Sequence, residues 1–359
     1  MSAFCAARVV EKTPLASDAI SLTLVVPDEH AESFRYRQGQ HLPMRATIDG
    51  EEVRRTYSIC SPVADNTLRV GIRLQDGGTF SGYVAEHIDV GDHIEIMPPT
   101  GHFYTELDPG QDKLYAAFVA GSGITPILSI VGTTLATEPH SEFVLFYGNR
   151  RRATTMFCDA LWALKNRYPQ RLSLHFLSSQ EDNEIDLYRG RLDAAKVRAL
   201  CAAFFQSRKP DDIFICGPNP MIDTVRGELK ALGFTRQQIH SERFRPLSGE
   251  WRKADAAEPA RRATPDGVRV TVTHDGRRET FTMDDEHDYL LDAARAHGID
   301  LPYSCKAGVC STCRTRLAVG RVEMDNNDAL EAWEVERGFI LACQSRPLTD
   351  EIELDYDTA

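Results

Sequence analysis

The sequence predicts three domains: an antiparallel β-barrel over residues 1–110, an α/β domain with a parallel sheet over 111–244, and a small α+β domain over 267–359. Three observations lead to this prediction: short alternating strands, then continuous apolar strands separated by amphipathic helices, then a cysteine-rich tail. A chain of 359 residues is long enough for two or three domains of roughly 100–200 residues each. Residues 245–266, rich in Ala, Pro, Arg and Glu, predict a linker.

The barrel domain is predicted from short apolar runs with turn signals such as Asp49-Gly50 and Gly77-Gly78 between them. Several runs alternate apolar and polar residues, which is typical of strands with one buried face. Even spacing of short strands favours a closed barrel. The predicted strands are residues 21–26, 42–48, 56–60, 68–74 and 93–97.

The second domain is predicted from a change of pattern after residue 111. Its strands are continuous apolar runs, as expected for strands that are buried on both faces of a parallel sheet. Amphipathic stretches of helical length separate these runs, and this alternation predicts a parallel sheet wound right-handed. The predicted strands are 114–120, 143–147, 172–177 and 213–216, and the predicted helices are 127–136, 156–167, 193–205 and 220–232.

The C-terminal domain is predicted from two strands, a helix and two later strands. It also carries most of the net charge, because residues 267–359 hold 19 acidic and 10 basic residues, or −9 of the −12 for the whole chain. Such an acidic domain favours electrostatic docking onto a basic face of a protein partner. The predicted strands are 268–273, 279–283, 319–324 and 351–355, and the predicted helix is 289–297.

The composition disfavours several classes of function. A net charge of −12 argues against nucleic acid or an anionic membrane surface as the main partner. No apolar run approaches the roughly 20 residues that span a bilayer. Arg8, Glu11 and Lys12 interrupt any apolar segment near the N-terminus, which argues against a secretory signal. We therefore expect a cytoplasmic protein without a nucleic-acid or membrane partner.

The cysteines point to a metal centre. Four of the nine, Cys305, Cys310, Cys313 and Cys343, fall in the C-terminal domain. Disulfides are rare in a reducing compartment, so clustered cysteines there indicate metal binding. The spacing Cys-x4-Cys-x2-Cys with a distant fourth cysteine is the plant-type pattern of a [2Fe–2S] cluster, and Gly308 allows the tight loop that this needs. Structural zinc and buried free thiols are the alternatives, although zinc sites prefer two paired knuckles.

Two segments of the predicted barrel together favour a flavin site. Arg55, Tyr57 and Ser58 lie on one predicted strand, where alternation places Arg55 and Tyr57 on the same face. An aromatic ring can stack on a flavin, and a guanidinium can bind a pyrophosphate. Gly78 permits close backbone approach, and the N-terminus of the helix around Ser81 favours phosphate. The residues by themselves do not distinguish FAD from FMN.

A glycine-rich loop between the first strand and first helix of the α/β domain favours a dinucleotide site. Gly121 and Gly123 let a pyrophosphate approach backbone N–H groups. A Gly-x-Gly pattern indicates a dinucleotide site only where it follows a strand and begins a helix, as it is predicted to do here. Thr125 suits the N-cap of the helix and Pro126 its first turn.

The residues after the second and fourth strands of this domain indicate which dinucleotide binds and where it lies. Arg150 begins a run of three arginines, and no acidic residue follows before Asp159. Because arginine there accommodates the 2′-phosphate whereas an acidic residue selects NAD, the residues favour NADPH; an ordinary basic loop is the alternative. Cys216 ends the fourth strand at the carboxyl edge of the sheet, where ligands bind, although a buried core thiol is its more common role.

In their order and context these features resemble the ferredoxin–NADP reductase superfamily, and the tail is similar to the plant-type ferredoxins. A flavin barrel, a nucleotide domain and a C-terminal ferredoxin follow one another in the phthalate-dioxygenase-type reductases. More closely, eight stretches look like the family of reductase subunits of ring-1,2-phenylacetyl-CoA epoxidases. They are residues 34–42, 54–60, 77–88, 120–130, 146–151, 215–222, 240–244 and 302–313.

The resemblance implies a role for each candidate residue. Tyr57 would stack on the flavin, and Ser58 would lie near the flavin N5. Ser58 and Glu242 would be the catalytic residues, and Phe244 would lie beside the flavin with Glu242. The flavin phosphates would be held by Arg55, Gly78 and Ser81. The pyridine nucleotide would be bound by Gly121, Gly123, Thr125, Pro126, Arg150, Cys216, Gly217, Pro218 and Met221, and the iron–sulfur cluster by Cys305, Cys310, Cys313 and Cys343.

The resemblance also implies an NADPH-dependent reductase that contains FAD and a [2Fe–2S] cluster. Electrons would pass from NADPH through both cofactors to the di-iron oxygenase component of a phenylacetyl-CoA epoxidase, in aerobic phenylacetate breakdown. A Rieske-type or other oxygenase is an alternative acceptor, because the acceptor leaves no motif in this chain. A non-enzymatic redox sensor or a zinc-stabilised binding protein is the alternative from a different class.

Overall fold

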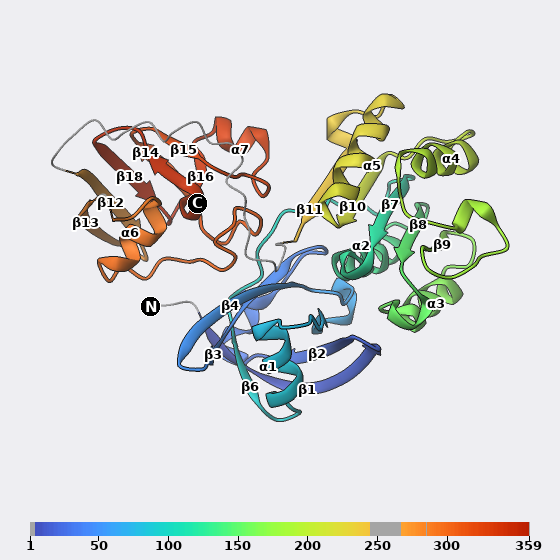
Figure 1. The fold of residues 1–359 in the computed structure, drawn as a ribbon, viewed down its shortest axis with the longest axis horizontal. Coiled ribbons are helices and arrows are strands. Elements are labelled where there is room, and N and C mark those ends of the chain that lie inside the picture. The colour runs from blue at the N-terminus through green and yellow to red at the C-terminus, as the bar shows by residue number, and fades with distance from the viewer. Residues whose placement is uncertain (1–3, 245–266, 285, 359) are drawn as a thin grey trace. The chain divides into compact units, whose positions relative to one another are not determined.

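The computed structural model describes residues 4–244, 267–284 and 286–358, so the predicted linker at 245–266 lies outside the described residues. The chain divides into two compact units (Figure 1). Residues Cys5–Phe244 form the first unit, and the described residues from 267 onward belong to the second. The first unit contains an antiparallel and a parallel sheet, and the second contains a mixed sheet.

A six-stranded antiparallel sheet forms the N-terminal part of the first unit, in the order β4-β3-β6-β1-β2-β5. Its edges meet where the chain after β4 bridges to β5, through Ile59 opposite Val70 and a 2.8 Å hydrogen bond from the Cys60 N–H to the Arg69 carbonyl. The sheet therefore forms the predicted barrel, with helix α1 packed against β3 and β4. These elements are β1 (Cys5–Ala16), β2 (Ala19–Val25), β3 (His41–Ile48), β4 (Glu51–Ser58), β5 (Leu68–Arg73), α1 (Thr79–His87) and β6 (His93–Ile96).

Strand β1 is the element of the barrel that the sequence pattern does not predict. Its first half does alternate, with Cys5, Ala7 and Val9 buried, but two of these side chains are short and give a weak apolar signal. Register shifts follow at Val9/Glu11 and at Pro14/Ala16. Because a bulge interrupts the period of two, the second half of the strand loses the alternation that would reveal it.

The parallel sheet of the first unit has the strand order β11-β10-β7-β8-β9. All four of its pairings are parallel, and the strands alternate with helices as predicted. The strands are β7 (Leu114–Ala120), β8 (Glu142–Asn149), β9 (Leu172–Ser178), β10 (Asp212–Gly217) and β11 (Ile239–Arg243). The helices are α2 (Ile124–Thr137), α3 (Cys158–Arg167), α4 (Ala194–Phe204) and α5 (Asn219–Ala231).

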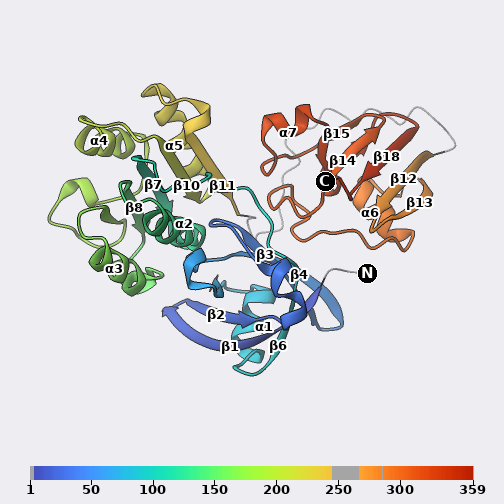
Figure 2. The ribbon, with the colours of Figure 1, turned by 180° about the vertical axis from the view of Figure 1, so that it is seen from behind.

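Strand β7 shows why these strands read as continuous apolar runs. Its residues Tyr115, Ala117 and Val119 belong to the core beneath α2 and α3, whereas Ala116 and Phe118 belong to the core beneath α4 and α5. Figure 2 shows these two pairs of helices on opposite faces of the sheet. Both faces of the strand are therefore buried, so alternation disappears and only apolar residues remain.

Helix α2 joins the parallel sheet to the barrel. It packs against β7, β8 and β10 and also against the short helical turn Val63–Asp65 of the barrel. A Cβ on Gly132 of α2 would lie 2.5 Å from the Pro62 ring, so only glycine allows this approach. The Ser129 hydroxyl donates to the Ser61 carbonyl at 2.7 Å. The two sheets of the first unit are therefore held in one compact body, which brings residues of both to a shared site.

A buried carboxylate holds the segment that crosses from the barrel to the parallel sheet. Glu138 is fully buried and accepts hydrogen bonds from the Tyr115 hydroxyl at 3.0 Å, the Ser141 hydroxyl at 2.7 Å and the Asp108 N–H at 3.1 Å. Burial of the phenol, followed by the nearby Glu138 charge, raises the pKa of Tyr115. Buried charges are tolerated only when hydrogen-bonded in this way.

Replacing Glu138 with alanine is expected to destabilise the first unit by roughly 3 kcal/mol, because it removes bonds to a charged acceptor and leaves two hydroxyls buried without it. The measurement is the urea midpoint at which flavin fluorescence reports release of FAD. Glu106→Ala is the control, since Glu106 is an exposed glutamate paired only across the surface with Arg37. Equal midpoints for the two variants would contradict a structural role for Glu138.

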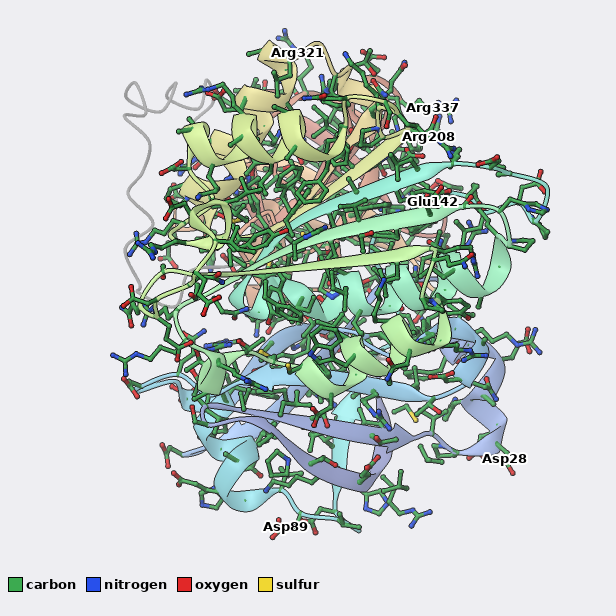
Figure 3. All side chains as sticks on the ribbon, turned by 90° about the vertical axis from the view of Figure 1, so that its right-hand side faces the viewer. Asp28, Asp89, Glu142, Arg208, Arg321 and Arg337 are labelled. Carbon is green, nitrogen blue, oxygen red and sulfur yellow. The ribbon has the colours of Figure 1, made fainter. Side chains whose placement is uncertain are left out.

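Surface ion pairs lie at the amino ends of the parallel strands, opposite to the carboxyl ends where ligands bind in such folds. Glu142 is the first residue of β8, and Arg208 precedes β10; their side chains lie 3.8 Å apart (Figure 3). Arg208 also contacts Asp112 at 2.9 Å. The amino ends of the strands therefore carry compensated charge, while the glycine-rich loop lies at the carboxyl ends.

The second unit is a mixed five-stranded sheet in the order β13-β12-β18-β14-β16, with a two-stranded sheet of β15 and β17. Helix α6 contributes Leu290, Leu291 and Ala293 to the core of this unit. The elements are β12 (Val268–His274), β13 (Arg277–Met283), α6 (Leu290–Ala296), β14 (Arg314–Val319), β15 (Val322–Met324), α7 (Ala332–Glu336), β16 (Phe339–Leu341), β17 (Ser345–Pro347) and β18 (Glu351–Asp355).

One predicted strand of this unit, residues 319–324, is wrong as a single element. The chain instead ends β14 at Val319, turns at Gly320 and begins β15 at Val322. Gly320 has a φ of 95°, and a Cβ there would lie 2.3 Å from the Glu351 carbonyl oxygen. The close approach of the neighbouring chain requires glycine at this turn and splits the apolar run between two sheets.

No helix in the described part of the chain is long and apolar enough to cross a bilayer. The longest of the described α-helices, α2, has 14 residues, whereas a spanning helix needs about 20.

Candidate functional site

Strand β4 and helix α1 bring the predicted flavin residues together. In the register of the barrel, Ser58 pairs with His41 and Tyr57 with Leu42 on β3. The Tyr57 ring lies 5.9 Å from the ring of Phe80 in the first turn of α1. Burial raises the pKa of the Tyr57 phenol, which keeps the ring neutral. The strand and helix thus present an aromatic face and a helix N-terminus side by side.

The N-terminus of α1 has the features of a phosphate site. Its N-cap is Gly78, in the segment that is predicted to open a short helix, and no side chain of the described residues caps it. A Cβ on Gly78 would lie 2.6 Å from the Ser81 hydroxyl oxygen, so a larger residue there would displace the Ser81 hydroxyl. Ser81 is buried with its hydroxyl 3.4 Å from the Gln75 N–H. Uncapped N–H groups and the helix dipole favour a phosphate here.

Arg73 does not take part in this arrangement. Although it lies on the strand between the two flavin segments, its guanidinium binds the Asp18 carboxylate at 2.6 Å and the Thr154 carbonyl at 2.8 Å. These contacts tie the barrel to the loop after β8, so Arg73 has a structural role inside the first unit.

The glycine-rich loop lies at the carboxyl end of β7, as predicted, but the helix begins earlier than expected. Residues Gly121–Gly123 form a short 3-10 turn that continues into α2, so Gly123 is the N-cap and the prediction of Thr125 as N-cap is wrong. Thr125 lies inside the first turn, where its hydroxyl donates to the Ser122 carbonyl at 2.9 Å. Pro126 lies in the first turn of α2, as predicted, where its missing N–H costs no helix bond.

Gly123 brings this loop against the end of β10. A Cβ on Gly123 would lie 2.3 Å from the Cys216 carbonyl oxygen and 2.9 Å from the Gly217 nitrogen. A Cβ on Gly217 would in turn lie 2.8 Å from the Met221 methyl group. Pro218 is the N-cap of α5, which starts directly after it. Two strand ends and two helix N-termini therefore meet at the carboxyl edge of the sheet, where dinucleotides bind in such folds.

The barrel and the parallel sheet meet at Glu242, on the edge strand β11. The Ser58 hydroxyl lies 3.5 Å from one oxygen of the Glu242 carboxylate, so two predicted residues far apart in the sequence do come together. Cys216 pairs with Glu242 in the register of β10 and β11. Burial, followed by the Glu242 charge, raises the pKa of the Cys216 thiol well above its usual value, so Cys216 stays a neutral thiol. Phe244 packs against the core that contains Cys216.

The sequence analysis did not identify His41, which lies next to Ser58 and Glu242. Its Nδ1 lies 3.6 Å from the second oxygen of Glu242. A single histidine at the start of a strand carries no motif, and only the antiparallel register places it opposite Ser58.

The arginines after β8 have an acidic neighbour that the local sequence does not show. Arg150, Arg151 and Arg152 are exposed, and the Arg152 N–H donates to the Glu181 carboxylate at 2.9 Å. The Gln180 N–H donates to the Arg150 carbonyl at 3.0 Å, which fixes the two loops together. Because β8 and β9 are parallel neighbours, their carboxyl ends bring residues 150–152 and 180–181 together.

The four clustered cysteines lie on a tight loop and on the turn before β17, and all four are buried. Gly308 has a φ of 72°, as predicted, and a Cβ there would lie 2.5 Å from the Asn326 carbonyl oxygen. The Asn326 side chain donates to the Ala307 carbonyl at 2.7 Å, and the Gln344 side chain donates to the Lys306 carbonyl at 3.1 Å. The loop is therefore clamped both to residue 326 and to the residue after Cys343.

The loop also holds two non-glycine residues with positive φ, Lys306 at 53° and Ser311 at 50°. Such backbone is costly and persists where the surroundings impose it, which is common at ligand sites. The Thr312 hydroxyl lies 3.2 Å from the Cys310 sulfur, and the Ala307 N–H donates to the Cys305 sulfur at 3.3 Å. The buried sulfurs of Cys305 and Cys310 therefore each have a hydrogen-bond partner on the same loop.

The four thiols interact with one another. Hydrogen bonding with Cys310 lowers the pKa of Cys305, but hydrogen bonding with Cys343 and burial raise it above the usual value overall. For Cys343, contact with Cys305 lowers the pKa, whereas contact with Cys313 and burial raise it well above the usual value. No group of three or more His, Cys, Asp or Glu in the described part of the chain is arranged to hold a metal ion. Cys305 interacts with Cys310 and Cys343, and Cys343 interacts with Cys313, so the four buried thiols are near one another, and four cysteine thiolates are the donor set of a [2Fe–2S] cluster.

Family models match all three parts of the chain. An oxidoreductase FAD-binding domain matches residues 6–104, and an oxidoreductase NAD-binding domain matches residues 118–227. A 2Fe-2S iron-sulfur cluster binding domain matches residues 272–348. These matches confirm the predictions of FAD, a pyridine nucleotide and a [2Fe–2S] cluster, and they favour the cluster over the zinc alternative.

Similar proteins share this arrangement over their whole length. The chain is 42% identical to one of the subunits of 1,2-phenylacetyl-CoA epoxidase from Escherichia coli, with 99% of each chain covered. It is 36% identical to the ferredoxin reductase component of 3-ketosteroid-9-alpha-monooxygenase of Rhodococcus rhodochrous, with 97% of this chain and 95% of that one covered. The solved structure of phthalate dioxygenase reductase shares the fold, with a TM-score of 0.57 at 22% identity and 98% of both chains covered. With its FAD-binding, NAD-binding and 2Fe–2S domains in this order, the chain belongs to the family of oxidoreductases that serve as reductase components of oxygenases.

Proposed function

We propose that this chain takes electrons from NADPH and delivers them, through FAD and a [2Fe–2S] cluster, to the di-iron oxygenase component of a phenylacetyl-CoA epoxidase in aerobic phenylacetate breakdown. The observation that carries the proposal is the 42% identity to the Escherichia coli epoxidase chain over 99% of both sequences. A match over the length of that relative supports the same task, because all three domains take part in it.

The residues around β4 and α1 fit FAD. Tyr57 offers an aromatic face for the flavin ring, and Arg55 on the same strand offers a guanidinium for the phosphates. Gly78 and Ser81 supply the helix N-terminus on which a pyrophosphate would be bound. When bound, FAD supplies the conversion between two-electron transfer with the nicotinamide and one-electron transfer with the cluster.

Ser58 and Glu242 are the proposed catalytic residues. The Ser58 hydroxyl lies 3.5 Å from the Glu242 carboxylate, which brings a hydroxyl of the barrel and a carboxylate of the parallel sheet into one site. Glu242 in turn lies beside the neutral Cys216 thiol at the end of the parallel sheet. Ser58 and Glu242 therefore connect the strand of the flavin residues with the sheet edge of the nucleotide residues. Phe244 packs against the core beside them, which contains Cys216.

The carboxyl edge of the parallel sheet is the proposed nicotinamide site. Gly121 and Gly123, followed by Thr125 and Pro126, open the phosphate-binding helix. The turn at the end of β10 is proposed to border the nicotinamide through Cys216, Gly217, Pro218 and Met221. We propose Arg150 for the 2′-phosphate, which makes NADPH the preferred donor.

Replacing Arg150 with alanine is expected to lower kcat/KM for NADPH about tenfold, the effect of losing one charge-assisted hydrogen bond, and to leave NADH almost unaffected. The measurement is steady-state reduction of ferricyanide with each nucleotide. Arg236→Ala, an exposed arginine at the opposite edge of the sheet, is the control. A wild-type preference for NADH would contradict the proposal and would turn attention to Glu181 as the acidic residue near the ribose.

Cys305, Cys310, Cys313 and Cys343 are the proposed cluster ligands, since they are buried, interact with one another and lie in the matched 2Fe–2S domain. The proposed domain boundaries are 1–110, 111–244 and 267–359, with the linker between the last two. The proposed location is the cytoplasm. The excess of acidic residues in the C-terminal domain supports docking onto a basic face of the oxygenase component.

Reconstitution tests this function directly. The purified chain is mixed with the oxygenase component of a phenylacetyl-CoA epoxidase, NADPH and phenylacetyl-CoA, and mass spectrometry follows the gain of one oxygen atom by the acyl-CoA, whose thioester stays intact. We expect epoxidation that needs all components, and NADPH consumption matched to product. Bleaching of the flavin band by NADPH without any epoxidation would leave a reductase with a different acceptor.

A second candidate is the reductase of another oxygenase, including a Rieske-type one. It is favoured by the 36% identity over 97% of this chain to the 3-ketosteroid-9-alpha-monooxygenase component. The same assay with that oxygenase and its steroid substrate separates the two candidates, because only the matching acceptor is expected to couple NADPH use to product.

A further inference from the structure

His41 begins strand β3 and lies in the barrel wall between two neighbouring strands. Its backbone pairs with Thr100 on one side, through hydrogen bonds of 2.9 and 3.0 Å. On the other side it stands directly opposite Ser58 of β4. Because residues directly opposite in an antiparallel pair point to the same face, the imidazole and the Ser58 hydroxyl leave the barrel on one side.

Both side chains contact the same carboxylate from different directions. The His41 Nδ1 lies 3.6 Å from one Glu242 oxygen, and the Ser58 hydroxyl lies 3.5 Å from the other. The His41 and Glu242 side chains are only 6% and 10% exposed. A carboxylate this far removed from water needs partners on its oxygens, and the barrel supplies one for each.

The imidazole has little room to move away from Glu242. The backbone of Gly101 lies so close behind the ring that a Cβ there would be 2.8 Å from Cε1 and 2.9 Å from Nδ1. Gly101 has a φ of 110°, which only glycine adopts easily. Its backbone therefore forms a rigid wall that holds the ring against the carboxylate.

Glu242 has no comparable support on its own strand. It belongs to β11, which pairs with β10 and forms the edge of the sheet among the described strands. The next residue, Arg243, is tied to Asp223 on α5, so the backbone is fixed while the Glu242 carboxylate reaches across to the barrel. The Cys216 thiol, which burial keeps neutral, is the register neighbour of Glu242 on β10.

We propose that His41 is a positioning residue: through its contact with Oε1 of Glu242 it holds the carboxylate so that Oε2 stays directed at the Ser58 hydroxyl. This inference rests on the proposed function, in which Ser58 and Glu242 act where the nicotinamide and the flavin meet. His41 acts through Glu242, so its loss changes the rate of electron entry and leaves nucleotide affinity intact.

The test compares His41→Phe, which keeps a ring but loses the polar contact, with His41→Asn, which keeps an N–H near the Nδ1 position. Stopped-flow mixing with NADPH gives the limiting rate of flavin bleaching and the apparent Kd for NADPH separately. We expect the limiting rate of His41→Phe to fall about tenfold with Kd changed less than about twofold, as for a misplaced catalytic group. His41→Asn is expected to recover most of the rate, and His30→Phe, on an exposed turn, is the control.

A second readout needs no turnover. With ¹⁵N-labelled histidine, the ring nitrogen resonances of His41 are compared between the wild-type chain and Glu242→Gln, and we expect the Nδ1 resonance to move when the carboxylate 3.6 Å away becomes an amide. Unchanged ring resonances overturn the contact even if His41→Phe does not fold. A limiting rate in folded His41→Phe equal to that of the wild type overturns the positioning role. A wild-type chain that NADPH does not bleach overturns the proposed function, while the ring resonances still decide whether His41 and Glu242 are in contact.

Discussion

Replacing Cys310 with serine is expected to abolish the [2Fe–2S] cluster and with it the transfer of electrons to an oxygenase. Cys310 is 4% exposed, and its sulfur lies 3.2 Å from the Thr312 hydroxyl. Loss of an outer hydrogen-bond partner of a metal site typically costs 10–100-fold in activity, so loss of a ligand should cost more than about 100-fold. Oxygenase-coupled NADPH oxidation is the activity measured, and electron paramagnetic resonance of the reduced protein reports the cluster.

The same variant should keep its NADPH–ferricyanide activity within about twofold, because the flavin and nucleotide residues belong to a separate compact unit. Cys158→Ser is the matched control, since Cys158 is a partly exposed thiol on α3 of that unit. A Cys310→Ser protein with a normal cluster signal would contradict the ligand assignment. Equal loss of both activities would show that the variant damages the first unit as well.

Replacing Gly123 with alanine is expected to weaken NADPH binding by about 100-fold, the loss that follows from displacing a binding group by about 1 Å. The added Cβ would lie 2.3 Å from the Cys216 carbonyl oxygen and 2.5 Å from its carbon. Both contacts are backbone atoms, so the glycine-rich loop and the end of β10 must separate. Since these two segments form the proposed nicotinamide site, the expected defect is in nucleotide affinity, with FAD retained.

The measurement is a titration of flavin bleaching against NADPH concentration under anaerobic conditions. Gly227→Ala is the control, because Gly227 lies on α5 of the same domain and an added Cβ meets nothing within 4 Å. The control is expected to bind NADPH normally and to unfold at slightly higher urea, since alanine is the better helix former by about 1 kcal/mol. Normal NADPH affinity in Gly123→Ala would rule out close contact of this loop with the nucleotide.

Most of the parallel sheet and of the metal loop could be predicted because their signals are local. In β7 every residue is apolar since both faces of the strand are buried, and this pattern is visible in seven consecutive residues. The cluster cysteines show the same principle, because Cys305, Cys310 and Cys313 must lie on one loop to meet. Gly308 follows from that loop, and its positive φ is confirmed.

Local signals failed where a neighbouring chain segment decides the geometry. Strand β1 carries register shifts that its own sequence does not announce. The N-cap lies at Gly123 and not at the predicted Thr125, because the 3-10 turn Gly121–Gly123 runs directly into α2. The run at 319–324 was split at Gly320 by the approach of Glu351.

By itself, the sequence determined the order of the three kinds of domain, a flavin and a dinucleotide site in the first two, and the loop that supplies three of the four cluster cysteines. These properties depend on periodicity and on spacing between residues close along the chain. Only the tertiary structure decided that His41, Ser58 and Glu242 form one group, and that Glu181 lies beside the arginines after β8. The physical reason is that strand register and the packing of two sheets against α2 bring distant residues within 4 Å, and neither leaves a pattern in the sequence around any one of them.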